Sequence, residues 1–94
     1  MKSHIWMSPA SGRTCAALLA LRAESMVPSR WRRFWMGEAE IKRRRDEVHR
    51  LSGIVASLRD SLEGTPYAED AILARSRCAK AHRALTGLLR GRGA

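Results

Sequence analysis

The sequence lacks the patterns that mark membrane-spanning proteins and most enzymes. Its longest apolar run, from Cys15 to Leu21, is far shorter than the roughly 18 residues that a membrane span needs. It contains no glycine-rich phosphate loop, and no Ser or Cys stands in register with a base that would activate it. We therefore expect a protein that is not an enzyme and has no cofactor and no metal ion.

Cysteine is also scarce. Cys15 and Cys78 fit neither a CxxC ligand pair nor a disulfide framework, so we expect a reducing, cytoplasmic location. Residues 1–23 contain basic, Ser and Thr residues but no acid, which is the composition of an organellar transit peptide if the source is eukaryotic. An over-long gene start ahead of Met26 is a competing explanation. Whether residues 1–25 belong to the mature protein stays open at this point.

Acidic residues are few. The 9 Asp and Glu are outnumbered by 18 Lys and Arg, which gives a net charge of +9 and a pI near 11.2. Such a charge favours polyanionic partners, namely nucleic acid or anionic lipid. Arg is far more frequent than Lys, which fits either the codon usage of a GC-rich genome or selection for a guanidinium that forks onto phosphate and stacks on bases.

What the sequence does contain is an all-α pattern of two helices around the turn Gly64-Thr65-Pro66. Apolar residues recur at coiled-coil spacing on both sides of this turn: Ile41, Val48, Leu51, Val55, Leu58 and Leu62 before it, and Tyr67, Ala71, Ala74, Cys78, Ala81, Leu85 and Leu88 after it. The pattern predicts an antiparallel hairpin with helices over 38–63 and 67–90, a turn at 64–66 and a tail at 91–94. Phe34 extends the first register backwards, so that helix could begin as early as Ser29, with Gly37 as a weak point.

The segment before the hairpin divides into two parts. We expect residues 1–26 to be poorly ordered, with disorder over 1–12 and a short helix from Thr14 to about Ser25. Val27-Pro28 would end that helix, because the residue before a proline is pushed out of the helical region. Residues 27–37 form a basic, aromatic arm.

The arm and the start of the first hairpin helix carry the main functional signal. Basic and aromatic side chains alternate there, as single-strand binding requires, since phosphate contacts give affinity and stacking adds sequence-tolerant energy. The predicted nucleic-acid-binding residues are Arg30, Trp31, Arg32, Arg33, Trp35, Lys42, Arg43, Arg44 and Arg45, with Phe34 as a further stacking candidate.

A plainer interpretation of the basic run remains open. Glu38 with Lys42, Glu40 with Arg44, and Asp46 with Arg50 are acid-before-base pairs four residues apart, which stabilise an exposed helix face by a few tenths of a kcal/mol each, roughly. Under this interpretation the arginines are solvated and locally paired rather than a binding site.

Three apolar residues lie off the two seams and predict a further packing surface: Ile54, Ile72 and Leu73. Either the segment from Leu18 to Leu21 folds back onto the hairpin, or a second hairpin completes a four-helix bundle. The sequence favours the dimer.

Three functional classes therefore follow. The first is a small basic protein that associates with RNA or single-stranded DNA. The second is a self-associating protein-interaction module. The third is a protein whose arm lies at a membrane surface, with aromatics at the headgroup boundary and arginines on anionic lipid. His49 and His82 fall at similar heights along the hairpin, but Cys78 is the one further ligand nearby and it points into the seam, so we do not expect a metal site.

Overall fold

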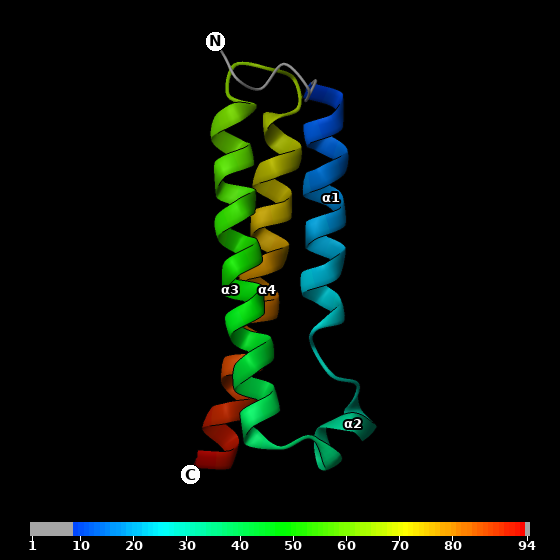
Figure 1. Cartoon of the computed structure of the whole chain (residues 1–94), viewed down its shortest axis with the longest axis vertical. Helices are drawn as coiled ribbons and strands as arrows, with labels where there is room; N and C mark the ends of the chain where they lie inside the picture. Colours follow the sequence, from blue (N-terminus) through cyan, green and yellow to red (C-terminus); the bar gives the residue numbers. More distant parts are fainter. Residues whose placement is uncertain (1–8, 94) are drawn as a thin grey trace.

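The computed structural model describes residues 9–93, and these residues form helices α1 (Pro9–Ser25), α2 (Arg30–Trp35), α3 (Glu38–Ser61) and α4 (Ala68–Gly93). Within this range there is no strand, which confirms the all-α class. Helices α1, α3 and α4 pack side by side along a common axis, and the short α2 lies at one end of them (Figure 1).

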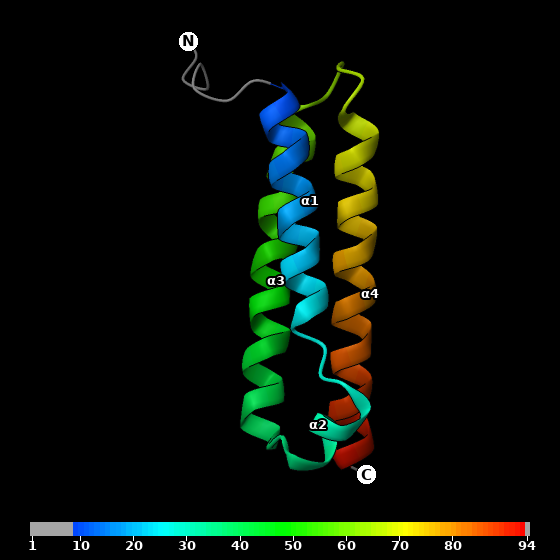
Figure 2. The same ribbon diagram turned by 90° about the vertical axis from the view of Figure 1, so that its right-hand side faces the viewer.

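The hydrophobic core lies between α3 and α4, which run in opposite directions (Figures 1 and 2). Most predicted seam positions are buried: Ile41, Val48, Leu51, Val55, Leu58 and Leu62 before the turn, and Ala71, Ala74, Cys78, Ala81 and Leu85 after it. The two outer positions of the second seam, Tyr67 and Leu88, are half-buried, and Tyr67 lies in the turn. Small side chains on α4 thus face the larger Val, Leu and Ile side chains of α3. Alternation of small and large residues across facing positions is what fills an interhelical core.

The connection between α3 and α4 uses the chemistry that the sequence indicates, over a slightly longer stretch. Gly64 has a φ of +85°, a left-handed conformation that side-chain-bearing residues rarely adopt. The Thr65 hydroxyl accepts a hydrogen bond from the Tyr67 N–H at 3.2 Å and donates one to the Leu62 carbonyl at 2.6 Å. Since α3 ends at Ser61 and α4 begins at Ala68, the turn spans residues 62–67 rather than 64–66.

The helix before the turn does not continue back to Ser29. Ser29 caps a separate helix, α2, by accepting a hydrogen bond from the Arg32 N–H at 3.4 Å. The chain is then extended at Met36 and Gly37, with ψ of 125° and 161°, and α3 starts at Glu38. Phe34 therefore does not extend the α3 seam as predicted; it lies on α2 and is 78% exposed. The physical reason is that Gly37 is a poor helix residue placed directly before two acids that favour a helix start.

The largest correction concerns the N-terminal segment. The sequence predicts disorder for residues 1–12, but α1 begins at Pro9; residues 1–8 lie outside the described residues. Helix α1 is the third member of the bundle, because Ala16, Ala20 and Ala23 are completely buried against the α3–α4 core. The segment from Leu18 to Leu21 thus lies in a helix that folds back onto the hairpin, as one of the two alternatives expected. Ile54, Ile72 and Leu73 stay exposed, so the dimer remains a prediction.

Polar contacts join α1 to both other helices. Arg13 pairs with Asp70 at 3.3 Å, and Arg22 pairs with Glu47 at 3.5 Å. The Glu24 carboxylate accepts two hydrogen bonds from the Arg77 guanidinium, at 2.6 and 2.8 Å.

The Arg77 contact lowers the pKa of Glu24. Together with the buried alanines, the ion pairs across the interfaces of α1 make residues 9–25 an integral part of the fold.

The bundle is a rod of 49 × 20 × 19 Å with a radius of gyration of 15.2 Å over Cα atoms. A compact chain of this length would have a radius of gyration of about 12 Å, so the molecule is elongated. We call the end that carries α2 and the last turns of α4 the α2 end, and the end that carries residues 62–67 the turn end (Figure 2). The residues from Arg30 to Arg45 that the sequence predicts to bind nucleic acid lie at or near the α2 end.

Candidate nucleic-acid interface

Helix α2 exposes all of its aromatic side chains. Trp31, Phe34 and Trp35 are 76%, 78% and 84% exposed, and no residue of the helix is buried. They stand at positions i, i+3 and i+4, which places them on one side of a helix. Three large rings with so little burial contribute almost nothing to the core. Their position therefore needs an explanation outside the stability of the bundle.

The arginines of α2 are exposed beside these rings. The Arg33 Nε donates to the Pro28 carbonyl at 3.5 Å, which ties this side chain to the loop before the helix. Arg30 and Arg32 have no carboxylate within ion-pair distance in the described part of the chain. Their guanidinium groups thus keep their donor capacity for an anionic partner.

The basic run of α3 is different, because its side chains already have acidic partners. Lys42 pairs with Glu38 at 3.0 Å, and Arg45 lies 3.5 Å from Asp46. The Arg43 guanidinium donates two hydrogen bonds to Glu40, at 2.6 and 3.0 Å. These pairs neutralise part of the predicted binding charge, as the plainer interpretation of the run expects.

Arg44 has a structural role. Its side chain is only 14% exposed, its Nε donates to Glu40 at 2.9 Å, and a terminal guanidinium nitrogen donates to the Met26 carbonyl at 3.0 Å. This last bond fixes the loop after α1 onto α3. The sequence treats Arg43, Arg44 and Arg45 as one phosphate-binding unit, whereas the structure separates Arg44 from its neighbours.

Glu40 is the shared partner in this cluster. The hydrogen bonds from Arg43, with those from Arg44 second, lower the pKa of the Glu40 carboxyl to about 2. One acid–base pair that the sequence predicts, Asp46 with Arg50, is not formed. The Arg50 guanidinium instead donates two hydrogen bonds to Glu47, at 2.6 and 3.0 Å. The Arg50 bond also lowers the pKa of Glu47, which faces Arg22 of α1 as well.

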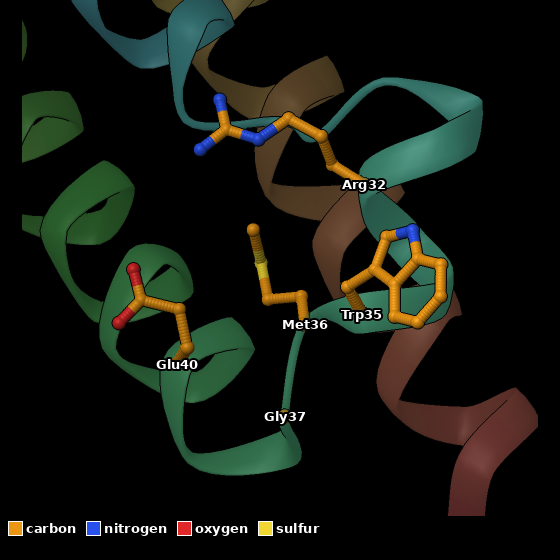
Figure 3. Close-up of a pocket in the computed structure, with 5 residues that line it drawn as sticks. All are labelled: Arg32, Trp35, Met36, Gly37 and Glu40. Atoms are coloured by element: carbon orange, nitrogen blue, oxygen red, sulfur yellow. The ribbon is translucent and has the colours of Figure 1, made fainter.

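Two open hollows flank α2. The first, of about 440 Å³, lies between α2 and the start of α3 and is lined by Arg32, Trp35, Met36, Gly37 and Glu40. In Figure 3 the Arg32 guanidinium and the Met36 side chain extend toward the space between the two helices, and the Trp35 ring lies on the α2 side.

The second hollow, of about 640 Å³, lies between α2 and the last turns of α4. It is lined by Arg30, Arg33, Phe34, Gly87, Leu88 and Gly91. Each hollow thus combines an aromatic ring with at least one arginine. The first also contains a carboxylate, that of Glu40, whereas the second is lined by no acidic residue among those the structure describes.

Charge is distributed unevenly along the rod. The predicted nucleic-acid-binding residues do not include the basic residues of α4, although the sequence shows them. Helix α4 contains no acidic residue after Asp70, yet it carries Arg83 and Arg90 on exposed positions in its second half. The acids Asp60, Glu63 and Glu69 lie instead around the turn end. The basic side of α4 therefore adds positive charge near the α2 end.

The predicted partner surface is exposed but not continuous. Ile54, Ile72 and Leu73 are 37%, 48% and 62% exposed. Ile72 and Leu73 are consecutive on α4 and so point about 100° apart, and Ile54 lies on α3. Leu18 and Leu21 of α1 are also exposed, by 60% and 54%.

The two hairpin histidines come together as their heights predict, with ring centroids 6.0 Å apart. Residues 9–93 contain no group of three His, Cys, Asp or Glu side chains that would hold a metal ion. In the same range, no helix combines the length and hydrophobicity that crossing a bilayer requires.

Comparisons give this chain no family. No protein-family model matches it, and neither the curated proteins nor the solved structures contain a match. A function is therefore inferred from the α2 end itself.

Proposed function

We propose that this protein binds single-stranded nucleic acid, RNA or single-stranded DNA, through its α2 end. The observation that carries the proposal is the pair of hollows beside α2, each of which places an aromatic ring next to an arginine. An unpaired base can stack on the ring while the adjacent phosphate accepts hydrogen bonds from the guanidinium. The chain has the residue types for both contacts within the lining of the same hollow.

The proposed contacts divide into two groups. Arg30, Arg32 and Arg33 of α2 provide the phosphate contacts, and Trp31, Phe34 and Trp35 provide the stacking surfaces. Lys42, Arg43 and Arg45 add charge at the rim, reduced by their acidic neighbours. Since Arg44 is held by Glu40 and the Met26 carbonyl, it supports the site rather than contacting the ligand.

The hollows favour a strand over a membrane surface. A lipid headgroup layer contacts the convex face of a short helix, where aromatic rings insert at the interface. Recesses beside the helix do not contribute to such a contact. Separate bases on a flexible strand fit separate recesses. A helix of six residues also offers little apolar area for anchoring to a bilayer.

The test uses the full chain and a fluorescein-labelled 12-nucleotide oligo(U), followed by anisotropy at low and moderate salt. We expect saturable binding that weakens with salt. In the double variant Arg30→Gln/Arg32→Gln, affinity falls and the slope of log K against log salt flattens by about 0.7 for each phosphate that is no longer bound. The matched control is Arg59→Gln/Arg75→Gln, which removes the same charge from exposed positions outside the α2 end.

An equal decrease of affinity in both double variants would reduce the effect to net charge and contradict a site at α2. Absence of binding at low salt would refute the proposal. In that case retention by vesicles with anionic headgroups, but not by neutral ones, would assign the α2 end to a membrane surface.

A second proposal is self-association, for which the sequence predicts a four-helix dimer. It is supported by the apolar side chains that α1 leaves uncovered on the bundle, Leu73 foremost at 62% exposure. Since α1 already supplies a third helix, the second copy would add to a three-helix bundle rather than complete a two-helix hairpin.

A further inference from the structure

We infer that the hollow between α2 and α4 is a nucleobase pocket whose floor is made by Gly87 and Gly91. The inference rests on the proposed function and names the part of the ligand that this hollow takes. It assigns a ligand-contacting role to α4, which the sequence marks only as a packing helix.

The floor is open because of the two glycines. Gly87 and Gly91 stand four residues apart, one turn of α4, and therefore lie on the same side of the helix. A Cβ atom built on either residue would meet nothing within 4 Å. A glycine inside a helix is less favourable than alanine, and no neighbour among the described residues requires these two to be small. The space next to both residues is therefore open, and a larger side chain at Gly87 would extend into it.

The walls match the two parts of a nucleotide. The Phe34 ring on α2 and the half-buried Leu88 side chain on α4 provide apolar surface for a base. Arg30 and Arg33 line the same hollow and supply guanidinium donors for a phosphate. The volume of about 640 Å³ lies within the range of roughly 300–1,000 Å³ that is typical of small-molecule pockets.

This hollow is better suited to a nucleotide than its neighbour on the other side of α2. The hollow between α2 and α3 contains the Glu40 carboxylate, which repels phosphate. Arg43 and Arg44 neutralise this charge only in part. The hollow above Gly87 and Gly91 contains cationic, aromatic and apolar groups and has no acidic side chain among its described lining residues. Its recognition is sequence-tolerant, because stacking needs only the face of a base.

The experiment fills the hollow without loosening the helix. Gly87→Met places an unbranched side chain over the floor and raises helix propensity. The matched control is Gly53→Met on the exposed surface of α3, where a Cβ also meets nothing within 4 Å. Both variants of the full chain are titrated with the labelled oligo(U) and with an abasic strand of the same length, which retains the phosphates and lacks the bases.

We expect Gly87→Met to bind oligo(U) at least about fivefold more weakly than the wild type, the equivalent of about 1 kcal/mol, which is the lower end of one base–aromatic stack. Its affinity for the abasic strand should be unchanged, and its melting temperature should be unchanged or higher. Gly53→Met should bind both strands like the wild type. Phe34→Ala should reproduce the selective loss from the opposite wall.

The proposed function and the nucleobase pocket are distinguished by these outcomes. If the wild type binds neither strand, the proposed function is wrong. If the wild type binds oligo(U) and Gly87→Met binds it equally well, nucleic-acid binding stands and the pocket is overturned. An equal decrease for oligo(U) and the abasic strand would also overturn it, since the hollow would then act on the phosphates alone.

Discussion

At the scale of single residues, Glu40 organises the α2 end. Its carboxylate accepts hydrogen bonds from both Arg43 and Arg44, and Arg44 in turn reaches the Met26 carbonyl beyond α1. One acid thus holds two arginines of the run, of which Arg44 is also tied to the backbone of another segment. Spacing alone predicts the Glu40–Arg44 pair, but not the bond from Arg44 to a backbone oxygen 18 residues away.

This arrangement predicts acid sensitivity. The pKa of Glu40 is lowered from 4.5 to about 2 by Arg43 and Arg44, so the unfolded chain binds more protons than the folded chain between these values. The stabilisation is fully present above about pH 4.5 and is lost as pH falls toward 2. Melting temperatures measured across this window by circular dichroism should therefore decrease.

In Glu40→Gln the decrease should be shallower. Glu63→Gln serves as control, because Glu63 makes no ion pair among the described residues. A Glu40→Gln profile as steep as that of the wild type would show that Glu40 does not contribute. The remaining slope belongs to Glu24 and Glu47, whose pKa values are also lowered by arginine.

Cys78 illustrates a residue whose role the pattern does predict. It occupies a seam position, it is completely buried, and burial raises the pKa of its thiol. Cys78 therefore packs as a small residue of the core, in the seam position that the sequence predicts.

At the scale of elements, α1 shows where pattern reading fails. Alanine is neither strongly apolar nor polar, so a helix that buries Ala16, Ala20 and Ala23 while exposing Leu18 and Leu21 has almost no visible amphipathic pattern. Leu18 and Leu21 point away from the side that packs, and of the three leucines only Leu19 is partly buried against the core. Close approach of small residues, rather than burial of large ones, attaches α1 to the hairpin.

Packing this close makes a specific prediction. Ala20→Leu introduces extra volume where the exposed fraction is 0%, and should lower the free energy of unfolding by about 1–3 kcal/mol in urea titrations. Ala17→Leu on the exposed side of α1 should change it by no more than about 0.5 kcal/mol. Equal effects of the two substitutions would contradict the packing of α1 described above.

Helix α2 is the opposite case. Its basic and aromatic residues stand out in the sequence, which predicts an arm over residues 27–37. The sequence also allows this arm to be the first part of α3. The extended backbone at Met36 and Gly37 is what turns α2 out of the α3 axis and opens a hollow on each side of it. A continuous helix would have carried Phe34 into the seam and left no such recesses.

At the scale of the whole molecule, the two ends of the rod differ in the side chains that they expose. Asp60, Glu63 and Glu69 lie around the turn end, while the exposed aromatic rings and the arginines of α2 lie at the α2 end. The acids near the α2 end, Glu38 and Glu40, are paired with basic residues of α3. A polyanion would therefore meet the molecule end-on. The long sides carry scattered exposed apolar residues, among them Ile72 and Leu73, on which the proposed self-association would depend.

Self-association is tested on these sides. Leu73→Asp should lower the mass measured by sedimentation equilibrium if Leu73 lies in an interface between copies, and should leave helicity unchanged because the side chain is exposed. Ser76→Asp, an exposed position on the same helix, controls for the added charge. A wild-type mass equal to one chain would refute the dimer. A lower mass in both variants would point to charge rather than to the apolar contact.

The sequence by itself determined the all-α class, the α3–α4 seam and the chemistry of the turn, because heptad spacing, Gly64 and Thr65 are local features that act wherever the chain goes. The tertiary structure alone decided that α1 is the third helix, that Arg44 is a structural side chain, and that Gly87 and Gly91 face α2 across a hollow. These three depend on contacts outside the heptad seam between residues that are far apart in the chain. Spacing predicts which residues meet across the hairpin, as for His49 and His82, but not where α1 or α2 meets it.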